Sequence, residues 1–218
     1  MEKNKPFVSK LDESPRMFKN NFLDYFSRVH FSVVLIIYLP LIAWMIYLAL
    51  NSYELYWVTF LSIFIGGGIF WTLFEYFLHR YFFHLDLKGK IGERVHFIVH
   101  GVHHNHPNDS KRLVMPPGAS LALALVLFGL FCVCFGFNMS LVFSFTSGFT
   151  LGYVTYDMMH FATHHSNYKG KWFLKIKTNH MMHHYKDHSL GFGLSNIFWD
   201  RIFGTLHNIS QGLGQQNK

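Results

Sequence analysis

Histidine is the residue type whose number and spacing could carry chemistry in this chain. Sixteen of the 218 residues are histidine. Most of them fall in four short motifs, namely His79-x4-His84, His100-x2-His103-His104, His160-x3-His164 and His180-x2-His183-His184. Residues three or four apart on a helix share a face, so each of the last three motifs can converge on one point. Neutral imidazole is the commonest protein ligand for metals, so the pattern predicts metal binding.

The first motif has a different spacing from the other three. Five residues on an ideal α-helix place the rings of His79 and His84 about 140° apart. The two rings can therefore share a site only if the helix ends or bends between them. Otherwise they serve different ions.

The number of histidines indicates what kind of metal site to expect. A closed structural zinc site needs four ligands, commonly including cysteine. The only two cysteines, Cys132 and Cys134, lie inside an apolar run. About ten histidines are too many for one tetrahedral ion, whereas two adjacent ions with four to five imidazoles each fit the count. Imidazole suits Zn, Cu, Fe and Ni alike, so the ligand type leaves the element open.

The elements that must position these motifs are apolar helices. Half of the residues are hydrophobic and 14% are charged, whereas soluble domains contain about a quarter charged residues. Apolar runs of 18 or more residues mark membrane spans. We expect a single-domain, all-α integral membrane protein over 1–218. Its four transmembrane helices are expected at about 31–50, 55–78, 119–136 and 139–160. A helical cap built from 79–118 and 161–218 would hold the di-metal site.

The distribution of charge predicts the orientation of the chain. All nineteen Lys and Arg residues lie in the ranges 3–28, 80–112 and 169–218. The two loops on the other side of the predicted spans contain none. Because positive charge collects on cytoplasmic loops, we expect the N-terminal segment 1–30, both termini and the metal site to face the cytoplasm. The net charge of +7 is accounted for by these membrane flanks, so no nucleic-acid partner is expected.

With their surrounding residues, the motifs resemble a known family. They read His79-Arg-Tyr-Phe-Phe-His84, His100-Gly-Val-His-His-Asn-His-Pro107, Tyr156-Asp157-Met-Met-His160-Phe-Ala-Thr-His164-His165 and His180-Met-Met-His-His-Tyr185. This set resembles the fatty acid hydroxylase superfamily, which comprises sterol desaturase-like integral-membrane di-metal oxygenases. The fatty acid 2-hydroxylase branch is the most similar. Gly191-Phe-Gly-Leu-Ser195 and Trp199-Asp-Arg-Ile-Phe-Gly-Thr205 resemble the C-terminal signature of that branch.

The resemblance implies a set of metal ligands: His79, His84, His100, His103, His104, His160, His164, His180, His183 and His184. It places His96, His106, His165 and His188 outside that set. We interpret His30 and His207 as ordinary histidines. Asp157, and less directly Glu75, are expected to accept hydrogen bonds from ligand rings, as carboxylates beside metal-bound histidines commonly do.

The resemblance also implies the chemistry. Two iron ions, which zinc can replace in purified protein, would use O2 and two external electrons to hydroxylate a lipid acyl chain. The expected position is C2 of a fatty acid or of a sphingolipid or ceramide-type N-acyl chain. Some members carry a fused cytochrome b5 domain, for which residues 1–30 leave no room. We therefore expect a separate ferredoxin, cytochrome b5 or reductase as electron donor, and a bacterial inner membrane as the location.

Two alternatives stay open at this point. The same scaffold could carry another reaction, such as sterol or acyl desaturation or carotenoid hydroxylation. A membrane protein that binds metal without redox chemistry is the second alternative. Transporters usually place their ligands near the membrane midplane in repeated halves, whereas these histidines lie toward one side of the membrane and no internal repeat is present.

Overall fold

The computed structural model describes residues 8–85 and 87–210, and the regular structure in that part of the chain is helical. The α-helices are α1 (Asn21–Phe26), α2 (Phe31–Tyr47), α3 (Trp57–Phe77), α4 (Gly89–His96), α5 (Val102–Asn105), α6 (Pro117–Cys134), α7 (Met139–His165), α8 (Lys171–Tyr185) and α9 (Phe198–Ile202). Three π-helical turns extend or join them, namely η1 (Leu48–Ser52), η2 (Leu78–Phe83) and η3 (Phe97–Gly101). The prediction of an all-helical protein is confirmed for the described residues.

Three of these helical stretches are long and apolar enough to cross a membrane: Phe31–Ser52, Trp57–Phe83 and Pro117–Cys134. They correspond to the first three predicted spans, and the π-helical turns carry the first two further than expected. The fourth predicted span, 139–160, lies in α7, which is 27 residues long but more polar. Its role as a span stays a prediction.

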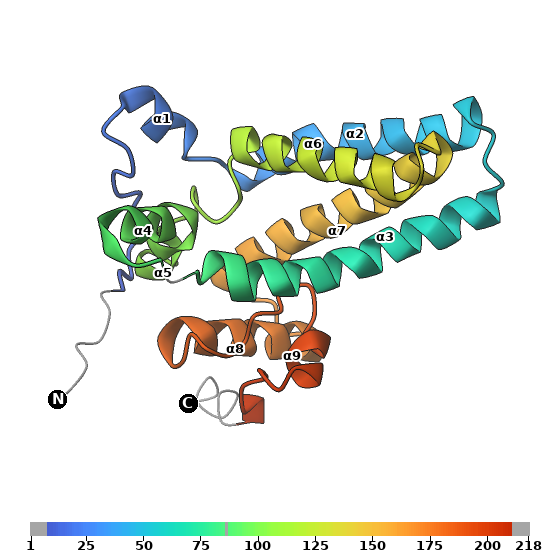
Figure 1. Ribbon diagram of the computed structural model, residues 1–218. Helices are drawn as coiled ribbons and strands as arrows, with labels where there is room; N and C mark the ends of the chain where they lie inside the picture. Colours follow the sequence, from blue (N-terminus) through green and yellow to red (C-terminus); the bar gives the residue numbers. More distant parts are fainter. Residues whose placement is uncertain (1–7, 86, 211–218) are drawn as a thin grey trace.

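The polarity of α7 follows from its place in the bundle. In Figure 1, α7 runs alongside α3, and its packing is most extensive against α3 and α2. Small and hydroxyl-bearing residues of α7, among them Ser144, Ser147 and Thr150, are buried in these contacts. A helix that faces protein on most sides does not need a lipid-compatible surface, and small residues allow close helix packing.

Glycines set the distance between α3 and α7. A Cβ atom at Gly148 would lie 1.9 Å from the Phe64 carbonyl oxygen, and one at Gly67 would lie 2.2 Å from the Phe145 carbonyl oxygen. Neither position can carry a larger side chain unless the two backbones separate. His79 lies in η2, directly after α3, and His160 lies within α7. The close contact between α3 and α7 therefore fixes these two histidines relative to each other.

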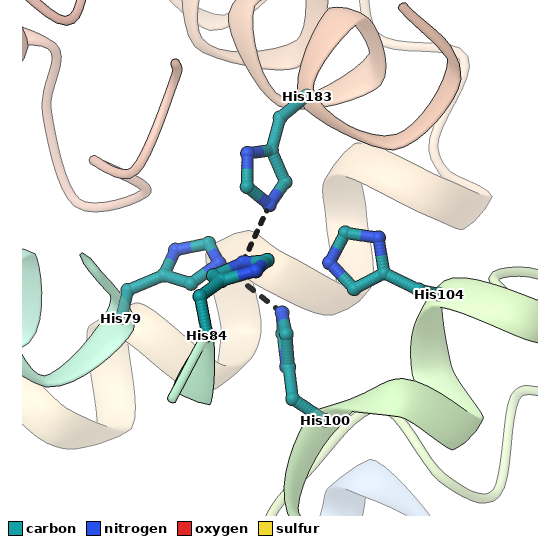
Figure 2. A group of neighbouring side chains, drawn as sticks. All are labelled: His79, His84, His100, His104 and His183. Atoms are coloured by element: carbon teal, nitrogen blue, oxygen red, sulfur yellow. Dashed lines mark hydrogen bonds between the residues drawn. The ribbon is translucent and has the colours of Figure 1, made fainter. Parts of the chain in front are cut away.

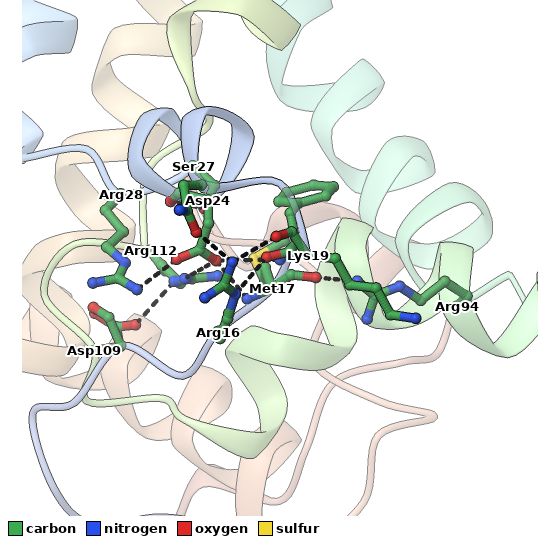
Figure 3. A network of polar contacts seen from close by, with 12 residues as sticks. Arg16, Met17, Lys19, Asp24, Ser27, Arg28, Arg94, Asp109 and Arg112 are labelled. Carbon is green, nitrogen blue, oxygen red and sulfur yellow. Dashed lines mark hydrogen bonds and ion pairs between the residues drawn. The ribbon is translucent and has the colours of Figure 1, made fainter.

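The N-terminal segment before α2 folds back onto the elements that carry the second histidine motif (Figure 3). Asp24 accepts a hydrogen bond of 2.6 Å from the Met17 N–H and forms ion pairs with Arg28 at 2.6 Å and Arg112 at 3.4 Å. Arg112 in turn lies 3.5 Å from Asp109. Desolvation raises the pKa of Asp24, but the backbone N–H groups and Arg28 outweigh it and hold the pKa at about 2. The segment thereby clamps the loop that follows α5.

Candidate metal centre

Ten histidines from four parts of the chain form two compact groups, and they are the ten residues predicted as ligands. Group one contains His79, His84, His100, His104 and His183. Group two contains His103, His160, His164, His180 and His184. Within each group the candidate ligand nitrogens all lie within 4.8 Å of one another. The groups adjoin, because the ring centroids of His104 and His184 are 4.4 Å apart.

The structure corrects how the motifs are shared between the groups. His100, His103 and His104 were expected to converge on one point, but His103 belongs to group two and the other two to group one. The last motif divides in the same way, with His183 in group one and His180 and His184 in group two. Pairs four residues apart therefore stay together, whereas the middle histidine of each triplet turns to the neighbouring group.

A π-helical turn brings His79 and His84 to the same site. Residues Leu78–Phe83 form η2, and His84 caps it. In a π-helix the backbone bonds run from i to i+5, so residues five apart lie one above the other instead of 140° apart. The two rings stack with centroids 5.2 Å apart, and both point into group one (Figure 2). The expected bend between them is thus a widened helical turn.

The Nε2 atoms face one another inside each group. In group one, His79 and His100 are 3.2 Å apart at Nε2, and His84 and His183 are 3.0 Å apart. In group two, the Nε2 separation is 2.8 Å between His160 and His103. Figure 2 shows the five rings of group one directed toward a common centre.

Backbone carbonyls determine the tautomer of two histidines in group one. Nδ1 of His79 donates to the Phe192 carbonyl at 2.7 Å, and Nδ1 of His183 donates to the Leu190 carbonyl at 2.7 Å. A neutral imidazole that carries its proton on Nδ1 has a lone pair on Nε2. Both Nε2 lone pairs therefore point into the group, which is the arrangement of a metal ligand with a hydrogen-bonded outer nitrogen.

The loop that supplies these carbonyls is held by two buried carboxylates. Asp200 accepts hydrogen bonds from the Phe192 and Gly193 N–H groups, both at 2.9 Å. Glu75 accepts from the Leu194 N–H at 2.6 Å and from the Ser195 N–H at 2.8 Å, and the Ser195 hydroxyl also donates to it. Glu75 thus supports the site through the loop and not, as expected, through a histidine. Sequence reasoning missed the role of Asp200, although the signature around it had been noticed.

Asp157 lies on α7, one turn before His160, and is buried. In the described part of the chain it makes no hydrogen bond to a histidine ring. Its carboxylate approaches the Tyr153 hydroxyl and the Met115 backbone N–H, although the Tyr153 hydroxyl and Oδ2 of Asp157 have no partner in good hydrogen-bond geometry. The proposed support of a ligand ring by Asp157 stays a prediction.

The surroundings of the two groups favour neutral imidazoles. Burial, together with the neighbouring His188 and His96, lowers the pKa of His84 to about 4. Burial and neighbouring rings also lower the pKa values of His100, His103, His180 and His184 well below the ordinary value. The rings are thus neutral near pH 7, and a neutral ring can offer a lone pair to a metal. Ten imidazole donors, seven of them on buried residues, and no carboxylate in either group fit a divalent metal of the imidazole-binding class.

The remaining histidines have different places. His30 and His165 are exposed. His188 is also exposed, and its ring centroid lies 4.8 Å from that of His104. His207, interpreted as ordinary, is 5% exposed, and its backbone N–H donates to the Asn179 side chain at 3.2 Å. It is therefore part of the packing behind the loop and not a surface residue.

An apolar pocket lies within the helical bundle, and two of its lining residues contact histidine rings. Its lining is almost entirely apolar and aromatic and comes from α2, α3, η2, α6 and α7. Phe83, at one end of the pocket, stacks on His100 with ring centroids 5.1 Å apart. Tyr156, also in the lining, lies 5.9 Å from the ring of His160. From Tyr156 to Thr146 the lining follows α7 for about 15 Å, at about 1.5 Å per residue.

Comparisons with known proteins agree with this geometry. A family model described as fatty acid hydroxylase matches residues 64–205. A dihydroceramide fatty acyl 2-hydroxylase of Arabidopsis thaliana is 34% identical over 215 residues, which cover 93% of this chain and 84% of that protein. A ceramide very long chain fatty acid hydroxylase of Saccharomyces cerevisiae is 38% identical over 197 residues, or 85% of this chain and 48% of that protein. This chain thus spans about half the length of the yeast relative.

A solved structure shows the same fold. It is of full-length scs7p with only the hydroxylase domain visible. It matches with a TM-score of 0.81 and 30% identity, covering 94% of this chain and 85% of that chain. Since the family model covers more than half of the residues and relatives align along most of the length, the chain belongs to the fatty acid hydroxylase family.

Proposed function

We propose that this protein hydroxylates a lipid acyl chain at C2, with a fatty acid or the N-acyl chain of a sphingolipid or ceramide as substrate. The observation that carries the proposal is the pair of five-histidine groups beside an apolar pocket, whose lining residues Phe83 and Tyr156 contact His100 and His160. Relatives named as fatty acyl and ceramide hydroxylases support the substrate class. Membership in the family makes the chain a hydroxylating oxidoreductase.

The ten histidines would hold two metal ions, one in each group, and we infer iron as the working metal. Bound iron supplies the redox chemistry by which O2, two electrons and two protons convert a C–H bond to C–OH and water. Zinc can occupy imidazole sites but has no redox chemistry. The electrons would come from a separate ferredoxin, cytochrome b5 or reductase.

The residues of the chain would bind and orient the substrate. The acyl chain would lie along α7 in the apolar pocket, with its carboxyl or amide end toward Phe83 and Tyr156. Phe83 and Tyr156 are the lining residues that contact histidine rings, so the carbon held beside them would be the one nearest the metals and would determine the position of hydroxylation. Water is excluded by the apolar lining, which protects the reaction from side reactions.

We infer that α7 completes a four-helix membrane bundle and that the cap lies on the cytoplasmic side. The distribution of Lys and Arg supports this orientation. A bacterial inner membrane stays a prediction, and the relatives described above are eukaryotic.

The test is a reaction with a substrate that carries two deuterium atoms at C2. The purified protein is loaded with iron and given O2 and a ferredoxin–reductase pair, and the product is analysed by mass spectrometry. We expect a product that has gained one oxygen and lost one of the two deuterium atoms. A product that keeps both deuterium atoms and carries oxygen elsewhere, or a desaturated product without oxygen, would overturn the proposal. Zinc-loaded protein, with no redox-active metal, is expected to give no product.

A further inference from the structure

The short helix α9 lies beside a membrane span and not out in the cap. Residues 161–218 were expected to form part of a cap outside the membrane. In Figure 1, α9 lies at the end of α8 and below α3, and it packs against α3. Nε1 of Trp199 donates to Oγ1 of Thr72 at 2.9 Å. Phe203, which follows α9, stacks on Tyr76 with ring centroids 5.1 Å apart. Thr72 and Tyr76 are both inside the candidate span Trp57–Phe83.

The position along that span gives the depth of α9. Thr72 is about 22 Å from Trp57 along the helix axis, and Phe77 is about 30 Å from it, at about 1.5 Å per residue. The hydrocarbon core of a bilayer is about 30 Å thick. Tyr56 and Trp57 are exposed aromatic residues at the start of the span, as expected at a membrane interface. The residues that contact α9 therefore lie at the opposite edge of the hydrocarbon core.

The outward face of α9 is apolar. Phe198 is 56% exposed and Ile202 is 54% exposed, and residues four apart share one helix face. Asp200 is completely buried on the inner side. Arg201 is exposed beside the apolar pair, from where a long basic side chain can reach lipid phosphates. An apolar face beside a basic residue at this depth is typical of an element that lies in the membrane interface.

We propose that α9 is an interfacial membrane element whose Phe198 and Ile202 side chains insert between lipids at the boundary of headgroups and acyl chains. Phe77 at the end of α3 is 38% exposed, and its ring centroid lies 5.5 Å from that of Phe203, which is 41% exposed. The exposed apolar surface of the candidate span thus continues toward α9, so lipid is the occupant that the geometry favours. The same helix carries Asp200, which holds the backbone of Phe192 and Gly193. The contact with the bilayer and the orientation of His79 thus depend on one element.

The test measures the depth of single labels in lipid nanodiscs made of phosphatidylcholine and phosphatidylglycerol. In a Cys134→Ser background, with the buried Cys132 retained, an environment-sensitive fluorophore is attached to Phe198→Cys or Ile202→Cys. Lys175→Cys, on the exposed side of α8, is the control for water. Val126→Cys, 71% exposed on α6, is the control for the lipid interior. Quenching by phospholipids with a nitroxide near the headgroup is compared with quenching by iodide.

We expect the labels at 198 and 202 to be quenched several-fold more by the nitroxide lipid than the label at 175, and several-fold less by iodide. Iodide quenching equal to that at 175 would overturn the proposal. Protection from both quenchers would also overturn it, because protein and not lipid would then cover α9. A label at 126 that iodide quenches as strongly as the label at 175 would overturn the membrane assignment itself. None of these results depends on the hydroxylation chemistry, whose failure would be seen only in the product assay.

Discussion

Replacement of Asp200 by Asn should weaken metal binding in group one while group two stays nearly intact. Oδ1 of Asp200 accepts from the Phe192 N–H at 2.9 Å and from the Thr205 hydroxyl at 2.8 Å. Oδ2 accepts from the Gly193 N–H at 2.9 Å and from the Asn179 side chain at 3.0 Å. An amide keeps only one acceptor oxygen, so in either orientation two donors would face an NH2 group.

The magnitude follows from those two lost hydrogen bonds. A hydrogen bond to a charged group contributes about 1.5–3 kcal/mol, so Asp200→Asn should destabilise the loop by about 3 kcal/mol at the lower limit. The Leu190 and Phe192 carbonyls would then no longer fix the Nδ1 atoms of His183 and His79. Loss of such outer partners typically costs about 10- to 100-fold in metal affinity or activity.

The assay is competition between the folded protein and a chelator, with bound metal measured by mass spectrometry. At a chelator concentration that leaves the unaltered protein with two ions per chain, we expect about one ion in Asp200→Asn. Asp187→Asn is the matched control, because Asp187 is exposed and accepts only from Ser189. Only protein that elutes as a folded species in size-exclusion chromatography is scored. Equal loss from both groups, or no loss, would refute the argument that the loop orients group one.

Three further predictions concern the pocket, the helix contact and the N-terminal clamp. Ala124→Trp, which fills the pocket, should reduce turnover of long acyl chains at least 10-fold and leave the metal content unchanged. Ala122 lies outside the lining, so Ala122→Trp should leave turnover unchanged. Equal turnover by the two variants would contradict the proposed acyl site. Gly148→Ala should destabilise the bundle by about 1–3 kcal/mol through overpacking, which thermal unfolding in detergent would measure. Gly129→Ala is the neutral control, because a Cβ atom there would meet open space. Because the pKa of Asp24 is about 2 when folded and about 3.9 when unfolded, its stabilising effect should be present above about pH 4 and lost as the pH falls toward 2. The hydrogen-exchange protection factors of residues 8–29, corrected for the intrinsic pH dependence of exchange, should fall with pH across that window in the unaltered protein and stay constant in Asp24→Asn.

The resemblance of the four motifs to the fatty acid hydroxylase family was sufficient to predict which ten histidines gather. Helical spacing alone accounts for the pairs four residues apart, because 3.6 residues per turn place such pairs on one face. The sequence could not show that His79 and His84 share a group, since a π-helical turn has no residue-type signature. The sequence also could not predict that each histidine triplet divides between the two groups. That division depends on where α5 and α8 lie relative to each other, which only the packed structure defines.

The supporting residues were harder to predict for a different reason. Every residue has a carbonyl group, so nothing in the sequence distinguishes the carbonyls of Leu190 and Phe192 as partners for His183 and His79. Glu75 lies 119 and 120 residues from the two N–H groups it accepts from. It is four residues before His79, and that closeness in sequence suggested a direct contact that the fold does not make. For α7, the residues that lower its hydropathy include buried serines and threonines within the bundle and the histidines of group two.

The way the histidines are shared makes the two metal sites partly dependent on each other. His183 serves group one, while His180 and His184 on the same helix serve group two. A movement of the α8 backbone must therefore disturb both groups, because all three rings move with it. A change confined to the loop that contains Leu190 and Phe192 acts only on the rotation of the His79 and His183 rings. The ratio of metal lost from the two groups consequently distinguishes a displaced helix from a displaced loop. Since metal binding to such a site is coupled to folding, the bound metals themselves should hold α5 and α8 in place against each other.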